Sequence, residues 1–309
     1  MVSRRDALKT FGLLAGAPLL QGFAAAAPPK KQFSFCLNVS TIRGQQAGFL
    51  RELEIAAQAG YSGVEIWTAP LSEWIRQGGS PRELSSRLSD LGLKVENAIG
   101  FAEWIVEDAR QRQAGIELLK REMAMLAQIG CTRIAAPPAG ASQTPGLNLM
   151  KAAERYRTIL ELGQTFGVVP QLEFWGASAN LSNLGEALLV AAQANHPAAR
   201  ILPDIYHLHR GGSGYDGLKL VAGNAIEVFH FNDFPGDIDR QKLTDSDRIF
   251  PGDGVAPIRE VIRTLAQKES PVVFSLELFN RGYWQRDATE VARTGLQKMK
   301  KLVSQALEN

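Results

Sequence analysis

From about residue 32 onward, short runs rich in apolar and β-branched residues alternate with longer amphipathic stretches. Runs of this length and composition predict buried strands, and the stretches between them predict helices. The pattern repeats along the whole of the remaining chain. We predict eight strands, at Phe33–Val39, Gly63–Trp67, Lys94–Ile99, Arg133–Ala136, Val168–Phe174, Arg200–Ile205, Ala225–Phe231 and Val272–Leu278.

The helical stretches carry start and stop signals. Ser80, followed by Pro81 and by Glu83, forms a capping sequence with proline at the first helical position. Glycines follow several of the predicted helices and fit the left-handed closing position. These glycines are Gly60, Gly92, Gly130 and Gly167. Their interval of roughly 35 residues matches the length of one strand-helix unit.

Eight such units predict a single-domain α/β fold, the (β/α)8 TIM barrel, over residues 28–309. A doubly wound open sheet is the competing architecture. No G-x-G-x-x-G motif follows an early strand, and this disfavours the open sheet.

Four side chains with metal-binding chemistry, Glu173, Asp204, His230 and Glu277, lie at the far ends of the last four predicted strands. In a barrel the carboxyl ends of the strands meet at one mouth, so these side chains are expected to converge. Three carboxylates and one imidazole form an oxygen-rich site that suits one Mn2+ ion best, with Mg2+, Co2+ or Zn2+ as alternatives.

Several short motifs, in this order, resemble those of the xylose isomerase-like TIM barrels. This group of sugar phosphate isomerases and epimerases includes ketose 3-epimerases and hydroxypyruvate isomerases. The motifs are GYSGVEIW (60–67), LEFW (172–175), DIYHLHR (204–210), HFNDFPG (230–236), RIFPGDG (248–254) and SLELF (275–279). The resemblance extends from about Phe33 to the C-terminus.

The resemblance implies roles for individual residues. Glu173, Asp204, His230 and Glu277 correspond to the metal ligands of the family's ketose epimerases, in which the two glutamates also serve as the catalytic acid and base. His207 corresponds to a further histidine of the family.

A substrate-contacting arginine of the family has two counterparts here, Arg240 and Arg248. We favour Arg248 because it leads directly into the PGDG sequence. A site closed against water also needs apolar walls. The side chains expected to form these walls are Trp67, Trp104, Trp175 and Phe279. Of these, Trp67 and Trp175 are also expected to contact the substrate.

The sequence therefore predicts a metal-dependent isomerase or epimerase of an unphosphorylated ketose or keto-sugar. Proton abstraction would give an enediolate stabilised by the metal. One alternative is a lyase or dehydratase that acts on 3-keto-glycosides with the same initial step. Another is a non-catalytic periplasmic sugar-binding protein. The sequence does not identify the sugar or the native metal. It is compatible with a homo-oligomer but does not determine the oligomeric state.

A nuclease is disfavoured. Apurinic endonucleases with this fold need additional histidines from early strands, whereas this chain has four histidines, none before His196. The net charge of +2 also gives no basic face for a nucleic acid. Among the remaining polar residues, Glu65 and Glu96 are expected to have supporting roles, His209 a structural one, and His196 a place in a surface loop.

The first 27 residues read as an export signal, with a charged start, a short apolar stretch and a small-residue end. Arg4-Arg5 followed by Leu8-Lys9 is similar to a twin-arginine signal and predicts a periplasmic protein. No later apolar stretch approaches the ~20 residues of a membrane span. The two cysteines, Cys36 and Cys131, are expected in the core and not in a disulfide.

Overall fold

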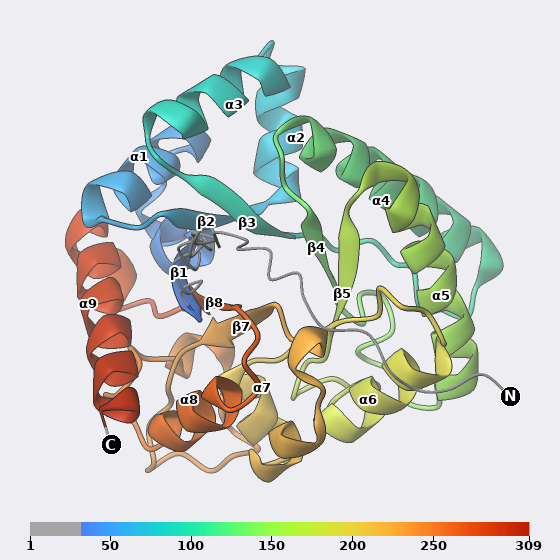
Figure 1. Cartoon of the computed structure of the whole chain (residues 1–309). Helices are drawn as coiled ribbons and strands as arrows, with labels where there is room; N and C mark the ends of the chain where they lie inside the picture. Colours follow the sequence, from blue (N-terminus) through green and yellow to red (C-terminus); the bar gives the residue numbers. More distant parts are fainter. Residues whose placement is uncertain (1–31, 309) are drawn as a thin grey trace, which may run out of the picture. The chain divides into compact units, whose positions relative to one another are not determined.

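The structure is a computed structural model that describes residues 32–308 (Figure 1). The predicted export signal lies outside the described residues and stays a prediction. Within the described range, no helix combines the length and the apolar character that a membrane crossing requires.

Eight parallel strands, hydrogen-bonded as a five-stranded and a three-stranded sheet, form a barrel surrounded by helices, which confirms the predicted (β/α)8 fold (Figure 1). Strands that follow one another in sequence are neighbours, and β8 pairs with β1 to close the ring. Isolated bridges between residues 201 and 226 and between 204 and 230 join β6 to β7. The strands are β1 Phe33–Asn38, β2 Gly63–Trp67, β3 Lys94–Ile99, β4 Arg133–Ala136, β5 Val169–Glu173, β6 Ile201–Leu202, β7 Val228–Phe231 and β8 Val272–Leu276.

The helices of the outer layer begin and end largely where the sequence signals predict. They are α1 Phe49–Ala59, α2 Thr68–Arg76, α3 Pro81–Asp90, α4 Ala109–Gln128, α5 Leu149–Phe166, α6 Leu184–Gln193, α7 Ile205–Arg210, α8 Ile258–Ala266 and α9 Ala288–Leu307. Short 3-10 helices occupy the connections: η1 Val39–Gln45, η2 Asp216–Leu220, η3 Gly223–Ala225, η4 Asp245–Asp247 and η5 Tyr283–Gln285. At the start of α3, the backbone N–H of Glu83 donates to Ser80 Oγ as expected.

β6 is shorter than predicted, with two residues in place of six. Pro203 follows it and has no N–H for the ladder, and Asp204 then caps α7 by accepting hydrogen bonds from the N–H groups of Tyr206 and His207. The chain therefore turns into a helix directly after Leu202. This early turn places the Asp204 carboxylate at the mouth of the barrel.

Apolar side chains fill two separate layers. The larger core lies between the strands and the outer helices, and a small cluster inside the barrel contains Cys36, Ile99, Ala135, Leu202, Val228 and Val273. Both cysteines are buried and free, which confirms the prediction made for them. Nearer the mouth, the interior becomes polar, and this polar layer supports the site described below.

Asp233, which follows β7, holds the connection to α8 in place. Its buried carboxylate accepts four backbone hydrogen bonds, from Phe234, Gly252, Gly254 and Ala256, at 2.9–3.0 Å. A backbone ladder with Ile249 adds two more contacts. The segment that carries Arg248 is therefore fixed at both ends.

Asp233→Ala is expected to lower the free energy of unfolding by roughly 2–4 kcal/mol, because it leaves buried N–H groups without an acceptor. Urea denaturation measures this loss. Asp253→Ala, which removes a half-exposed carboxylate paired with Lys298 in the same loop, is the control and should change stability little. Equal stability of the two variants would contradict the role given to Asp233.

Candidate active site

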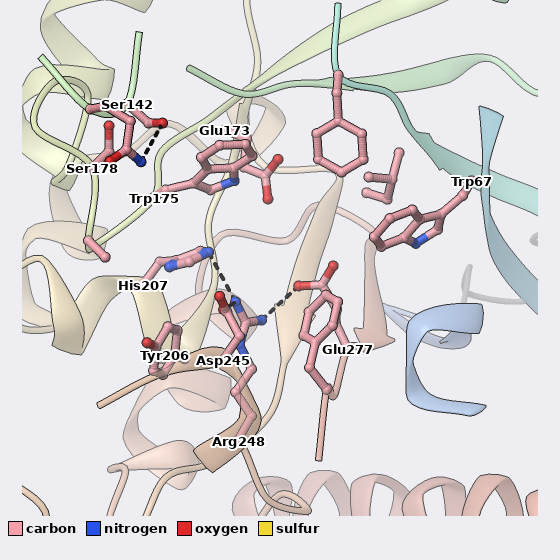
Figure 2. Close-up of a pocket in the computed structure, with 15 residues that line it drawn as sticks. Trp67, Ser142, Glu173, Trp175, Ser178, Tyr206, His207, Asp245, Arg248 and Glu277 are labelled. Carbon is pink, nitrogen blue, oxygen red and sulfur yellow. Dashed lines mark hydrogen bonds and ion pairs between the residues drawn. The ribbon is translucent and has the colours of Figure 1, made fainter. Parts of the chain in front are cut away.

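A cavity of about 340 Å3 opens at the carboxyl ends of the barrel strands (Figure 2). Its lining includes six residues predicted from the sequence: Trp67, Glu173, Trp175, His207, Arg248 and Glu277. The other two predicted residues, Asp204 and His230, are fully buried beside it. The structure thus brings all eight predicted site residues to one place.

Three of the four predicted metal ligands, all carboxylates, surround a ring nitrogen of the fourth, His230. His230 Nδ1 lies 3.1 Å from Glu277 Oε2 and 3.7 Å from both Glu173 Oε1 and Asp204 Oδ2. One ligand atom each from Asp204, His230 and Glu277 lies within 4.8 Å of the others. Each side chain comes from a different strand end, so the barrel holds the spacing of the group.

The other ring nitrogen of His230 is fixed by Glu65. His230 Nε2 lies 3.1 Å from Glu65 Oε1, and the Glu65 carboxylate also accepts from side chains of Asn38, Asn97 and Ser275. Burial alone would raise the pKa of Glu65, but His230 and these donors hold it below the usual value. Because an ionised carboxylate only accepts, Nε2 carries the proton that points to Glu65.

The remaining nitrogen of His230 fits a metal ion. Nδ1 is buried and has no hydrogen-bond partner, even though three carboxylates face it. A histidine whose outer N–H bonds a carboxylate and whose inner nitrogen faces further oxygen donors is the usual arrangement at a metal centre. The donor set of one nitrogen and three carboxylates therefore suits a divalent cation.

Glu65→Gln is expected to weaken the affinity for a divalent cation by about 10- to 100-fold, because the His230 N–H exchanges a charged acceptor for a neutral amide oxygen. Isothermal titration with Zn2+ measures the change. Glu96→Gln is the matched control, since this barrel glutamate instead pairs with Lys94 and Arg133. Unchanged affinity in Glu65→Gln would contradict the supporting role.

Glu173 and Glu277 differ in their surroundings. Glu277 Oε1 accepts from Asn38 Nδ2 at 3.0 Å, and Asn38 Oδ1 in turn accepts from the Trp67 indole N–H at 3.2 Å. Within the described residues, no hydrogen-bond donor contacts the Glu173 side chain. Burial, reinforced by the charges of Glu277 and Asp204 although His230 opposes it, raises the pKa of Glu173 to about 8. Such a pKa suits a general base near neutral pH.

Arg248 is the only cationic side chain among the residues that line the cavity. Its Nη1 donates to Asp204 Oδ2 and Glu277 Oε2, both at 2.7 Å, and its Nη2 donates to Asp245 Oδ1 at 2.6 Å. Figure 2 shows the contact between Arg248 and Glu277. Burial would raise the pKa of Asp204, but the guanidinium lowers it below the ordinary value. The alternative Arg240 donates to the Arg210 carbonyl and does not line the cavity.

His207 lines the cavity and lies between two hydrogen-bond donors. The backbone N–H of Gly176 is 3.1 Å from His207 Nδ1, and Arg248 Nη2 is 3.1 Å from Nε2. Burial is the main reason that the pKa of His207 falls to about 4, which keeps the ring neutral. A neutral imidazole has one acceptor nitrogen, so the ring accepts from one of these two donors. His207 is therefore a polar but uncharged part of the cavity wall.

The apolar walls differ from the prediction in one residue. Trp67, Trp175 and Phe279 line the cavity, but Trp104 does not. Trp104 is buried in the core, where its Nε1–H donates to the Pro137 carbonyl. The wall contains Phe101 instead, which the sequence did not single out.

The remaining histidines lie away from the cavity lining, as expected. His209 stacks on Phe234 with ring centroids 4.0 Å apart, and His196 accepts a local hydrogen bond from the Ala198 N–H in the connection before β6. Asp245 is a further residue that the sequence did not indicate. It is an acidic residue of a short 3-10 helix, and no pattern in the sequence marks it as facing Arg248.

The family model described as "Xylose isomerase-like TIM barrel" matches residues 53–302. The chain belongs to this family. Among curated relatives in the xylose isomerase-like group, an inosose isomerase of Bacillus licheniformis is 25% identical over 274 residues, which cover 87% of this chain and 97% of that protein. A 3-dehydroshikimate dehydratase of Pseudomonas putida is 23% identical over 256 residues, or 80% of this chain and 39% of that protein.

Solved structures share the xylose isomerase-like fold. The IolI protein with a bound zinc atom superposes with a TM-score of 0.81 at 22% identity, covering 89% of this chain and 100% of that one. D-Psicose 3-epimerase with D-tagatose, from Clostridium cellulolyticum H10, superposes with a TM-score of 0.71 at 16% identity, covering 87% and 99%.

Proposed function

We propose that this protein is an isomerase or epimerase of an unphosphorylated ketose or keto-sugar, and that the reaction begins with removal of a proton beside a carbonyl group. The observation that carries the proposal is the pair of cavity-lining carboxylates, Glu173 and Glu277, both within 3.7 Å of His230 Nδ1. Inosose isomerases and ketose epimerases among the similar proteins support sugar isomerase-type chemistry.

Glu173, Asp204, His230 and Glu277 would hold one divalent cation, for which we propose Mn2+ ahead of Mg2+, Co2+ and Zn2+. When bound, the cation would supply Lewis acidity that favours proton loss beside a carbonyl. The zinc atom in the similar IolI structure supports a divalent ion at such a site.

The side chains would divide the proton transfers. Glu173, which lines the cavity and accepts from no donor within the described residues, is suited to accept the proton. Glu277, oriented by Asn38 and Arg248, is suited to deliver a proton from its own side of the cavity. The neutral His207 ring would lie beside the bound sugar, and the aromatic walls would exclude water from the reacting carbon.

The charge of the cavity supports a substrate without phosphate. Three acidic side chains line the cavity, Glu173, Asp245 and Glu277, and the single lining cation, Arg248, is already paired with three carboxylates. His207 adds no charge because its pKa is lowered to about 4. Within the described lining, no further cationic side chain is left to bind a phosphate group.

Deuterium exchange tests the proposal. The metal-loaded protein is incubated in deuterated water with a panel of ketoses and 3-keto-glycosides, and recovered sugars are analysed by mass and by NMR. Deuterium at a carbon beside the carbonyl, without loss of mass from the skeleton, supports isomerisation or epimerisation. Binding without exchange anywhere in the panel would instead indicate a sugar-binding protein.

Elimination is the second candidate, since it starts from the same proton. The similarity to a 3-dehydroshikimate dehydratase supports elimination as the alternative reaction. A base beside a keto group also labilises a β-substituent, so a 3-keto-glycoside would lose its aglycone. The same exchange experiment separates the two outcomes, because elimination lowers the mass of the sugar product.

Metal binding is expected to release protons and to strengthen as pH rises. In the metal-free site, Glu173 has a pKa of about 8, and the pKa of His230 is raised because Glu277 and Glu65 outweigh the opposing effect of burial. Both groups must lose a proton to become ligands, so the dissociation constant should fall between pH 6 and pH 8.5. Calorimetric titration in buffers of different ionisation enthalpy counts the protons, and a pH-independent affinity would contradict these assignments.

We further propose that the protein is exported to the periplasm by the twin-arginine route. Arg4-Arg5 and the apolar stretch that follows support this proposal. Cell fractionation of the full chain and of an Arg4→Lys, Arg5→Lys variant tests it, since the variant should stay in the cytoplasm.

A further inference from the structure

The outer part of the cavity has an aromatic surface that the proposed proton transfers do not need. The Trp67 and Phe101 ring centroids are 5.3 Å apart, and those of Phe101 and Trp175 are 6.2 Å apart. We call these three rings the aromatic rim. Phe101 is 44% exposed, whereas Trp104 in the same loop is buried. An exposed ring that belongs to a cluster of three aromatic side chains beside a cavity is a candidate ligand surface.

The aromatic rim is held in place. Arg43 lies 4.5 Å from the Trp67 ring centroid, and the Trp67 N–H bonds to Asn38. The Phe101 loop packs tightly on α4, because a Cβ at Gly115 would lie 2.7 Å from the Glu103 backbone. The rim is therefore an ordered surface of the cavity.

The wall beyond the rim is polar. Ser142, Gln143 and Ser178 line the cavity, and Figure 2 shows Ser142 and Ser178 on the other side of the view from Trp67. The buried Asn180 fixes this wall, since its side chain accepts from the N–H groups of Gly146 and Leu147 and donates to the carbonyls of Ala141 and Thr144. Apolar and polar walls together suit a ring with two faces and hydroxyl groups at its edge.

The size of the cavity agrees with a ligand larger than one sugar ring. Pockets for drug-sized ligands span about 300–1,000 Å3, and this cavity of about 340 Å3 falls within that range. The reacting carbon of a sugar must lie near Glu173 and Glu277 at the inner end. A second ring attached to that sugar would reach the aromatic rim.

We infer that the rim is a subsite for a second, uncharged ring, so that the substrate is a glycoside or a similarly ring-substituted keto-sugar and not a free monosaccharide. This inference rests on the proposed function for the position of the first ring. The ring would stack on Phe101 and Trp67, and its polar edge would meet Gln143 and the two serines. An anionic aglycone is disfavoured, because the one cationic side chain of the lining, Arg248, is already paired.

Binding of two inert glycosides tests the inference. Phenyl and methyl β-D-glucopyranoside share the sugar ring, lack a carbonyl and so cannot undergo the proposed reaction. Calorimetry with the full, metal-loaded chain is expected to give roughly three- to tenfold tighter binding of the phenyl compound, the size of one aromatic contact. Phe101→Ala should reduce this preference to about one, and Phe101→Trp should retain it.

Leu220→Ala is the matched control, because it removes an 86% exposed apolar side chain that does not line the cavity. It should leave the preference unchanged. Equal affinity for the two glycosides, failure of the phenyl compound to bind, or a preference that survives in Phe101→Ala would each overturn the inference.

Exchange measurements with the corresponding 3-keto compounds separate this inference from the proposed function. Exchange on the methyl compound without a phenyl preference in binding means that the function stands and the subsite fails. A phenyl preference abolished by Phe101→Ala, without exchange on either compound, means that the subsite stands and the proposed reaction fails.

Discussion

Glu277→Gln is expected to slow deuterium exchange into a keto-sugar by about 10²- to 10⁴-fold, the usual contribution of general acid-base catalysis. Glutamine retains the size of the side chain and one acceptor oxygen, which can accept from Asn38 or from Arg248 but not from both, and it cannot carry the proton. The rate is measured by NMR at saturating Mn2+, with the metal content of each sample determined, so that a weakened ligand is not mistaken for a lost acid.

Glu154→Gln provides the control, since Glu154 is exposed on the outer face of α5. It should exchange at the rate of the unmodified protein. Retained sugar binding with lost exchange in Glu277→Gln supports the role in proton transfer. An unchanged exchange rate at full metal occupancy would rule that role out.

Arg248→Met is expected to destabilise the metal-free protein by about 3–5 kcal/mol, because it leaves buried carboxylates without a cation. Asp204 and Glu277 each accept from Arg248 at 2.7 Å, and all three side chains are buried. For a domain of this size the melting temperature should fall by roughly 10 °C. Saturating Mn2+ should recover a large part of the loss, since the ion supplies a new positive partner for the same carboxylates.

The control for this prediction is Arg157→Met, which removes an exposed arginine paired with Glu161 on α5. Its melting temperature should change little with or without metal. A loss in Arg248→Met that is identical with and without Mn2+ would show that the arginine acts through packing alone.

The fold and the residues at the inner end of the cavity can be predicted from the hydrophobic pattern of this one sequence. The composition of the strands identifies them in the sequence, and in a barrel the carboxyl ends of the strands converge. The positions of Glu173, Asp204, His230 and Glu277 at these ends are therefore enough to predict that they meet. β6 was overestimated because Pro203 and the helix cap at Asp204 override the propensity of the residues around them.

The outer cavity was less predictable, because loop residues have no periodicity. Phe101 and Trp104 lie in one short loop, and the sequence pointed to the wrong aromatic of the two. Which ring enters the core is decided by a partner distant in sequence, the Pro137 carbonyl that accepts from the Trp104 N–H. Asp245 was missed for a similar reason, since its contact with Arg248 depends on how η4 is placed against the barrel.

The hydrogen bonds of Asn38 connect the aromatic wall of the cavity to the carboxylates at its inner end. One amide receives the Trp67 N–H and donates to both Glu65 and Glu277. A substitution that reshapes the cavity at Trp67 therefore also disturbs the orientation of a proposed acid-base residue. Effects of mutations at positions 67 and 277 should therefore be non-additive. Any change of substrate specificity made at the aromatic wall of this barrel is expected to alter the acid-base residue as well.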